Sequence, residues 1–396
     1  MNGFNISDAT HIKLGGNDIT ALYLGSTKLW PLSTDYSKEY LTFESLADNN
    51  TITWTFTGSD PIQNVIYWSK NGTSWTSAIA STSDTPVSLA TLNKGEKMYL
   101  KGENVTYASS ASKYSHFNSD YEFNVSGNIM SLIYGDNFIG QITLSSSYNF
   151  AGIFRSSKVY DASNLILPAT TLANYCYSYM FYDCTSLATA PVLPATTLAQ
   201  SCYMSMFAAT KITAAPELPA TILADSCYAY MFYGCTSLVT APVLPATTLA
   251  TYCYSYMFYG CTSLVTAPVL PATTLANYCY RNMFYGCTSL VTAPVLPATI
   301  LQPKCYQHMF FRCASLKTAP ELPATTLVTY CYAYMFQNCT SLSYIKCLAT
   351  NISASNSHDN WLYNVASTGT FVKPTSMTLF PEGANGIPSG WTVVNV

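Results

Sequence analysis

The sequence predicts a mainly β protein with short helical turns, and three observations lead to that prediction. One phrase of about 26 residues recurs seven times between residues 165 and 346. Short runs of β-branched and aromatic residues with turn residues between them precede it, and 49% of the chain is hydrophobic. A fixed period of this length is typical of a solenoid, whose units bury their apolar faces against one another. We therefore predict an N-terminal hairpin module (1–38), a β-sandwich (39–136), a repeat solenoid with an N-terminal cap (137–346) and a C-terminal cap (347–396).

Few charges distinguish the chain from ordinary soluble domains. Asp, Glu, Lys and Arg make up 9% of its 396 residues, against about 25% in typical domains. The net charge is -3, and no segment is basic enough to predict nucleic-acid binding. The first residues lack the basic and apolar regions of a secretory signal. No apolar run approaches the ~18–20 residues that span a bilayer. We therefore expect synthesis in a cytosol and no membrane insertion.

Residues 1–38 are expected to form the hairpin module. Two β-like runs, Ile12–Leu14 and Ile19–Leu24, flank the turn sequence Gly15-Gly16-Asn17-Asp18. An isolated hairpin is only marginally stable in water, so the module is expected to pack on another surface. A partner protein or further copies of the module, and the second domain of the same chain, are equally good candidates for that surface.

Residues 39–136 carry several strand-like runs with turn residues between them. Short strands at this spacing predict a small sandwich of the Ig-like type. The pair Asn71-Gly72 predicts a hairpin with a type I′ turn. Trp54, Trp68 and Trp75 admit two interpretations, an aromatic platform for a sugar or ordinary core packing. We favour core packing.

The repeat units begin with a proline and have a period of 26 residues, with one unit of 25. Within each unit, the spacing Leu-x-x-Ala-Pro-x-Leu-Pro predicts a short strand, because proline cannot donate to a ladder and truncates it. A Met-Phe pair recurs in every unit and is expected on a helical or 3₁₀ turn opposite that strand. The short unit has residues 208–212 in place of the usual Tyr-Gly-Cys-Thr-Ser-Leu. We expect a local shift of the coil there.

All 14 cysteines lie between Cys176 and Cys347 and follow the repeat. A disulfide ladder or metal sites would explain this pattern, and so would buried free thiols that act as small hydrophobic side chains. The eight-residue spacing of Cys176 and Cys184 matches no zinc motif, and a cytosolic origin disfavours disulfides. We favour free thiols and expect no metal and no cofactor.

The repeat resembles the BspA-like leucine-rich repeats. Residues Met231–Leu238 match the A-F-x-x-C-x-x-L part of that pattern, and Leu244-Pro245 matches its I-P part. One departure is a Cys-Tyr pair where the family has I-G. The whole layout resembles virion-attached fibre or adhesin proteins of bacteriophages that infect anaerobic gut bacteria, through Ile19–Trp30 and Gly369–Trp391. The fibre resemblance implies a homo-oligomer, a trimer, and a virion-anchoring N-terminus whose residues are Leu22, Tyr23, Leu24, Leu29 and Trp30.

Positions that differ between units mark two candidate surfaces, one directly after each Cys-Tyr pair and one on the predicted strands. Exposed residues tolerate change, so we expect both sets to be exposed; selection for contact and drift in solvent both explain the variation. Tyrosine supplies a large contact area at low entropy cost, which suits glycans or cell-surface proteins. The candidate binding residues are Tyr179, Tyr230, Tyr256, Arg281, Asn282, Gln307, His308 and Tyr334.

We find no constellation of catalytic residues in the sequence. The four histidines, His11, His116, His308 and His358, lie near no nucleophile or carboxylate pair in sequence. The repeats contain only isolated acids, which argues against a glycosidase with two carboxylates ~5–9.5 Å apart. We therefore expect a protein that is not an enzyme.

The leading hypothesis from the sequence is a structural fibre protein, a head or tail fibre, on the exterior of a bacteriophage virion assembled in the host cytoplasm. Its N-terminus would bind other virion proteins, and its repeats would bind a host-surface glycan or protein. No nucleic-acid partner is expected. The alternative is a bacterial cell-surface adhesin of the BspA-like type.

Overall fold

The computed structural model describes residues 35–59, 64–82 and 85–396, and the backbone of four short strands before them. There β1 (Lys13–Leu14) pairs with β2 (Asn17–Asp18), and β3 (Leu22–Leu24) pairs with β4 (Thr27–Trp30), both antiparallel. The prediction of one hairpin around residues 15–18 is therefore wrong. Pairing Leu14 with Asn17 leaves two residues between β1 and β2, the commonest hairpin length, so residues 17 and 18 become strand. The side chains of the predicted anchoring residues, Leu22, Tyr23, Leu24, Leu29 and Trp30, lie outside the described part of the chain.

Two sheets follow. One has six strands in the order β15-β14-β5-β11-β7-β8, and the other has the order β10-β6-β13-β12 with β9 beside β6. Burial alternates along β11 and β14 in the first sheet and along β6 and β13 in the second, which gives each sheet one apolar face. These faces meet at Phe43 of β5 and Phe117 of β13, whose ring centroids are 5.0 Å apart. The strands are β5 (Leu41–Ser45), β6 (Asn50–Thr57), β7 (Val65–Ser69), β8 (Thr76–Ile79), β9 (Ser81–Thr82), β10 (Val87–Leu92), β11 (Lys97–Gly102), β12 (Ala108–Ser110), β13 (Lys113–Ser119), β14 (Phe123–Asn128) and β15 (Val159–Ile166).

The β7–β8 connection differs from the predicted type I′ turn. The two strands do pair as a hairpin, with Trp68 opposite Thr76, but six residues separate them. Of the central pair, Gly72 has a positive φ of 72° and Asn71 does not, whereas a type I′ turn needs both. The Asn71 side-chain oxygen instead accepts hydrogen bonds from the backbone N–H groups two and three residues on. This Asx-type turn holds Asn71 in an ordinary conformation.

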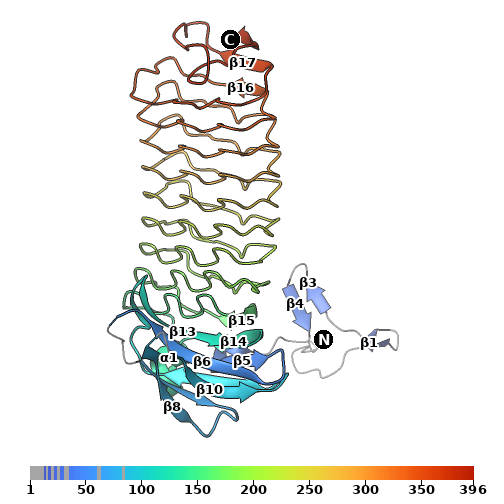
Figure 1. Ribbon diagram of the computed structural model, residues 1–396, viewed down its shortest axis with the longest axis vertical. Helices are drawn as coiled ribbons and strands as arrows, with labels where there is room; N and C mark the ends of the chain where they lie inside the picture. The colour runs from blue at the N-terminus through green and yellow to red at the C-terminus, as the bar shows by residue number, and fades with distance from the viewer. Residues whose placement is uncertain are drawn as a thin grey trace, which may run out of the picture.

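Helix is scarce in the described residues: 3₁₀ turns η2 (Tyr36–Lys38) and η3 (Gly135–Asn137), and α1 (Ser131–Tyr134). The prediction of a mainly β protein is therefore confirmed. The two-sheet unit continues directly into the repeats, because β15 pairs in parallel with β14 and so belongs to the six-stranded sheet. Figure 1 shows the repeats as coils that rise in a column from this unit, from green at β15 to red at the C-terminus.

Neighbouring coils are joined by a regular alternation of backbone hydrogen bonds. The N–H groups of Tyr228 and Tyr230 bond to carbonyl oxygens of the next coil, at 3.1 and 3.0 Å. The intervening N–H groups of Ala229 and Met231 close turns three residues back within their own coil. Because every buried N–H needs an acceptor, this alternation satisfies the backbone donors of a segment that is neither helix nor strand. The Met-Phe pairs thus lie on turns, as predicted, but not on a helix.

Left-handed residues recur at every fourth position of these turns and form three outward columns. Nearly all of them are the third residue of a turn that is closed by a backbone hydrogen bond from the next residue to the carbonyl three positions earlier. Tyr230 is one example, in the turn that the Met231 N–H closes on Tyr228 O. A turn with a positive φ there is of type II and favours glycine or asparagine. The columns are Tyr175, Ser201, Ser226, Tyr252, Tyr278, Lys304, Tyr330 and Asn356; Tyr179, Ser205, Tyr230, Tyr256, Asn282, His308, Tyr334 and Asn360; and Asp183, Ala209, Gly234, Gly260, Gly286, Arg312, Asn338 and Asn364. We call them the first, second and third columns, and their surface the turn face.

The core between the turns and the Leu-Pro segments is built from stacked aromatic rings. The tyrosine after each first cysteine is at most 1% exposed and lies 5.8–6.1 Å from its counterpart in the next coil. A phenylalanine stack runs beside it at 5.5–5.9 Å. The first stack begins on Tyr107 and Phe150, and the second on Phe43 and Phe154. The two-sheet unit therefore covers the end of the repeat core.

The 25-residue unit does not shift these stacks, contrary to expectation. Phe207 lies 5.7 and 5.9 Å from its two neighbours, close to the separations elsewhere. Thr210 occupies the place of the second cysteine and donates its hydroxyl to the Phe207 carbonyl. The missing residue therefore falls between Thr210 and Ile212, outside the stacked core.

All 14 cysteines are free and buried, as predicted. In six coils the second cysteine donates its S–H to the phenylalanine carbonyl of the preceding coil. Cys261, for example, reaches Phe232 O at 3.1 Å. Burial raises the pKa of Cys261 well above its ordinary value. A small side chain with a weak donor therefore fits this position.

The predicted strand of each unit is reduced to one residue. Isolated parallel bridges, such as Thr240 to Ala214 and Thr266 to Thr292, take its place in the middle coils. A proline follows two residues later in each unit, which prevents the ladder from extending. A sheet returns at the end of the column, where β16 (Tyr344–Lys346), β17 (Gly369–Lys373) and β18 (Trp391–Asn395) are parallel.

The coil geometry extends into the predicted C-terminal cap. Asn356, Asn360 and Asn364 have positive φ at the same four-residue spacing as the units before them. Trp361 is fully buried and stacks 6.3 Å from Tyr332. This coil could not be recognised from the repeat pattern, because its core residues do not include the usual Cys-Tyr and Met-Phe pairs.

Candidate binding site

The structure brings the eight predicted binding residues into two neighbouring columns of the turn face. Tyr179, Tyr230, Tyr256, Asn282, His308 and Tyr334 all belong to the second column. Arg281 and Gln307 each precede a second-column residue and lie between the first and second columns. Equivalent positions of successive coils line up along the column, so these residues share one surface although they span about 155 positions of sequence.

The expectation that all eight residues are exposed is not met, because two are buried and six are only partly exposed. Asn282 and Gln307 are each 7% exposed, and the other six are half-buried. Asn282 lies between Tyr256 and His308 along the second column, and Gln307 lies between the first and second columns, so residues of neighbouring coils cover both. Variation between units at these positions is therefore not a sign of free solvent exposure.

Stacked rings line the turn face. In the second column the rings of Tyr230 and Tyr256 are 4.5 Å apart, and in the first column Tyr252 and Tyr278 are 4.3 Å apart. These separations are shorter than those of the buried stacks. The first column was not predicted from the sequence, although its residues lie four positions before those of the second column and several of them are tyrosines as well. Nor was a fourth row, beside the third column, formed by Tyr233, Tyr259, Tyr285 and Phe311.

Cations interrupt these rings in the coils around residues 278–312. The Arg281 guanidinium lies 5.7 Å from the ring centroids of both Tyr256 and Tyr278. The Lys304 ammonium lies between Tyr278 and Tyr330, at 5.1 and 5.2 Å. Such contacts stabilise a cation over a ring face. Lys304 therefore continues the first column in place of a tyrosine.

The histidine of the second column is held neutral. His308 stacks 4.6 Å from Tyr334. Burial, and to a lesser extent the charge of Arg281, lowers the pKa of His308 to about 4. At neutral pH the positive charge of this region therefore comes from arginine and lysine.

The second variable set, on the Leu-Pro segments, is exposed as expected. Three consecutive coils carry a valine at the same place in this set, and these valines, Val243, Val269 and Val295, are 75–76% exposed. Exposed glutamates, Glu217 and Glu321, occupy the same place in the coils on either side. Contiguous exposed apolar patches are typical of protein contact surfaces. The two faces thus differ in chemistry, one aromatic and cationic, the other aliphatic.

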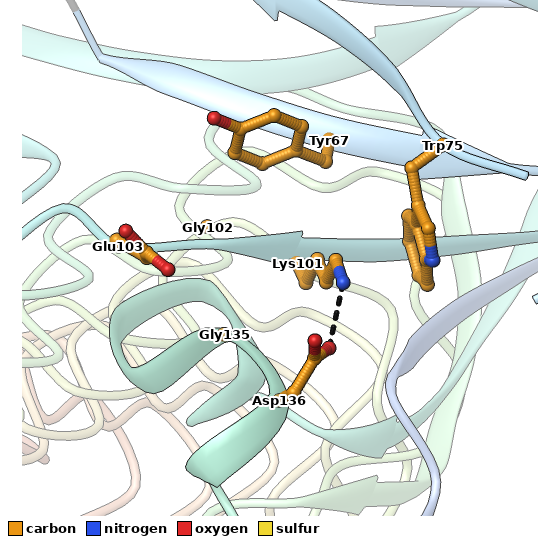
Figure 2. Close-up of a pocket in the computed structure, with 7 residues that line it drawn as sticks. All are labelled: Tyr67, Trp75, Lys101, Gly102, Glu103, Gly135 and Asp136. Carbon is orange, nitrogen blue, oxygen red and sulfur yellow. Dashed lines mark hydrogen bonds and ion pairs between the residues drawn. The ribbon is translucent and has the colours of Figure 1, made fainter. Parts of the chain in front are cut away.

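The two-sheet unit contains a pocket of about 300 Å³, lined in part by Tyr67, Trp75 and Glu103. Figure 2 shows the Lys101 ammonium between Trp75 and Asp136, with its ion pair to Asp136 at 2.6 Å. The Lys101 hydrogen bond, followed by one from Tyr40, lowers the pKa of the Asp136 carboxyl. The Asp136 carboxylate therefore serves as the structural partner of Lys101.

The three tryptophans of this unit do not form one sugar platform. Trp54 is fully buried in the core, as favoured from the sequence, and Trp68 packs against that core. Trp75 alone lines the pocket and packs edge-on against Tyr40, with ring centroids 5.0 Å apart.

Metal and membrane features are absent from the described residues. Over 35–59, 64–82 and 85–396, no three His, Cys, Asp or Glu side chains group as metal ligands would. Within the same ranges, no helix has the length and apolar character needed to cross a bilayer.

Comparison with known proteins agrees with the repeat geometry. The family model for the BspA type leucine rich repeat region (6 copies) matches residues 154–291, 200–342 and 280–384, more than half of the chain in total. These matches run past residue 346 into the coil that the sequence pattern concealed. Searches of curated proteins and of solved structures give no match. On this evidence the chain belongs to the BspA type leucine-rich repeat family.

Proposed function

We propose that this chain is a non-catalytic recognition protein that binds a cell-surface glycan or protein through its turn face. The observation that carries this proposal is the ordered ladder of half-buried aromatic rings, exemplified by Tyr230 and Tyr256. Because the left-handed turns fix the backbone and the stacking fixes the rings, little side-chain entropy remains to be lost on binding. Rings spaced along the column suit a ligand that is itself a repeating polymer.

We further propose the setting in which this surface works. Residues 1–38 anchor the chain to other virion proteins of a bacteriophage, the two-sheet unit acts as an Ig-like spacer, and the coils form a solenoid that extends outward as a head or tail fibre. A homotrimer is the expected assembly. The fibre-like stretches Ile19–Trp30 and Gly369–Trp391 support this setting. Membership of the BspA type family supports the alternative, a bacterial cell-surface adhesin.

Binding by the turn face is tested with labelled full-length chain on candidate host cells. One variant replaces Tyr230, Tyr256 and Tyr334 with serine, which Ser205 already supplies at this position with a φ of 55°. Retained folding of that variant is checked by its thermal midpoint. We expect it to lose cell binding.

The matched control replaces exposed residues on the other face, Val243, Val269 and Val295, with threonine. It should bind cells as the wild type does. Loss of binding in the threonine variant alone would assign recognition to the Leu-Pro face and overturn the proposal.

The virion setting has its own test. Deletion of residues 1–38 should release the protein from purified phage particles, and persistence on the particles would refute the anchoring role. Immunogold labelling separates the two settings, since gold on particles supports a fibre and gold on bacterial cells supports an adhesin.

A further inference from the structure

Unpartnered buried polar atoms gather at one place on the turn face. Arg281 Nε, Asn282 Oδ1, Gln307 Oε1 and His308 Nδ1 have no hydrogen-bond partner among the described residues. They belong to two consecutive coils and to the same part of each coil. Asn282 and Gln307 are more than nine-tenths buried. Leaving a buried polar atom unpaired costs about 1–3 kcal/mol, so such a cluster calls for an explanation.

The same two coils carry three cations of the turn face, Arg281, Lys304 and Arg312. Between residues 226 and 358 the chain contains one acid, Glu321, which lies on a Leu-Pro segment and pairs with Lys346 at 2.9 Å. In the coils that carry Arg281, Lys304 and Arg312 the turn face therefore contains no carboxylate, since Asp183 of the third column belongs to an earlier coil. Each of these cations lies over one or two aromatic rings, which leave the guanidinium and ammonium N–H groups able to donate to an anion.

Aromatic rings flank these cations along the column. Tyr252 and Tyr278 stack on one side of Lys304, and Tyr330 lies on the other. The apolar face of a sugar ring packs well on an aromatic ring, and amide side chains bond to hydroxyl groups. Cations, amides and rings therefore alternate over neighbouring coils.

We propose that Arg281 and Lys304, with Asn282, Gln307 and His308, form a site for an acidic polysaccharide. The cations bind its anionic groups, the amides and the neutral imidazole pair with hydroxyls, and the adjacent tyrosines carry sugar rings. We call these five residues the acidic-saccharide site. The inference rests on the proposed function and specifies its ligand class.

Binding of defined polymers to the immobilised full-length chain tests this site. The probes are polygalacturonate, teichoic acid and chondroitin sulfate, which carry carboxylate, phosphate and sulfate, with neutral dextran and a single-stranded oligonucleotide for comparison. We expect at least one acidic polysaccharide to bind, more weakly as salt rises because ions screen the contact. The acidic polymer that binds best identifies the anionic group. Tighter binding of dextran or of the oligonucleotide would overturn the proposal.

Substitutions taken from neighbouring coils keep the fold intact. Arg281→Ser copies Ser255, and Lys304→Tyr copies Tyr278 and Tyr330, at equivalent positions. Each should weaken binding by about 10-fold or more, the effect of losing one charge-assisted hydrogen bond. The control Lys317→Ser, which copies Ser343 on the Leu-Pro face, should not change it.

The outcomes separate this inference from the proposed function. If Arg281→Ser and Lys304→Tyr leave polysaccharide binding unchanged, the acidic-saccharide site is wrong. If the chain binds host cells through its tyrosines but binds none of the acidic probes, the proposed function stands and this inference fails. Loss of cell binding in both cation variants supports the two together.

Discussion

The hydroxyl groups of the buried tyrosine stack provide a sharp test of the packing described above. Tyr254 is 1% exposed and stacks 5.9 Å from Tyr228 and 5.8 Å from Tyr280. Its hydroxyl has no hydrogen-bond partner among the described residues. Replacing Tyr254 with phenylalanine keeps both stacks and removes the unpaired group. We expect the free energy of unfolding to rise by about 1–2 kcal/mol, the size of that penalty.

Truncation of the same residue should act in the opposite direction. Tyr254→Ala leaves a cavity at about 3–5 kcal/mol and removes two stacking partners at about 0.5–1.5 kcal/mol each. A total loss of about 4–8 kcal/mol is expected from these two terms. The surface control Tyr233→Phe, on a side chain that is 37% exposed, should stay within about 0.5 kcal/mol of the wild type.

Guanidinium unfolding followed by circular dichroism measures these changes as shifts of the midpoint at constant slope. Thermal midpoints are less sensitive, because about 2.1 cal/mol/K per residue over a chain of this length gives a shift of only about 1 °C per kcal/mol. If Tyr254→Phe lowered the midpoint by more than the surface control does, its hydroxyl would have to be hydrogen-bonded, and the reasoning would be refuted.

Three further predictions concern the backbone, pH and the thiols. Gly260 has a φ of 71°, a left-handed conformation that strains alanine even though a Cβ there would meet no clash. Gly260→Ala should therefore lower the free energy of unfolding by about 1–2 kcal/mol, whereas Ala209→Gly in the same column should raise it. Changes of the same sign for the two variants in chemical denaturation would contradict this prediction. Burial lowers the pKa of both His116 and His308 to about 4. As pH falls below about 6.5, these histidines therefore take up protons in the unfolded chain before they do so in the folded one, and the free energy of unfolding should drop by about 2 kcal/mol per histidine between pH 6.5 and 4. Replacing both histidines with glutamine should flatten that part of the pH profile of stability. Cys261 and the other thiols should resist a thiol reagent in the native protein and react on denaturation, since burial raises their pKa; rapid labelling of native protein would show that the coils open.

The repeat period and the core columns were accessible from the sequence because each coil meets the same environment. Met257, Phe258 and Cys261 are fully buried, and their counterparts recur at fixed offsets, so the pattern alone identified them as core. The free state of the cysteines followed from the same argument. The degenerate coil around Trp361 escaped notice because it keeps the backbone conformation and changes the side chains.

The N-terminal and loop details were less predictable. Two hairpins replaced the single one expected before residue 31, because turn residues such as Asn17 and Asp18 can also pair as strands. Asn71-Gly72 has a typical turn sequence, yet its conformation depends on where the Asn71 side chain finds donors. Local propensity leaves such choices open, and small differences in hydrogen bonding decide them.

The sequence by itself determined the coil period, the buried columns and the identity of most residues on the turn face. Only the tertiary structure decided which outward residues touch and which are covered. Arg281 meets Tyr256 across 25 positions of sequence, and Asn282 is covered although it belongs to an outward column. The physical reason is that exposure between coils depends on the side chains one period before and after. A single unit, however regular, does not contain that information.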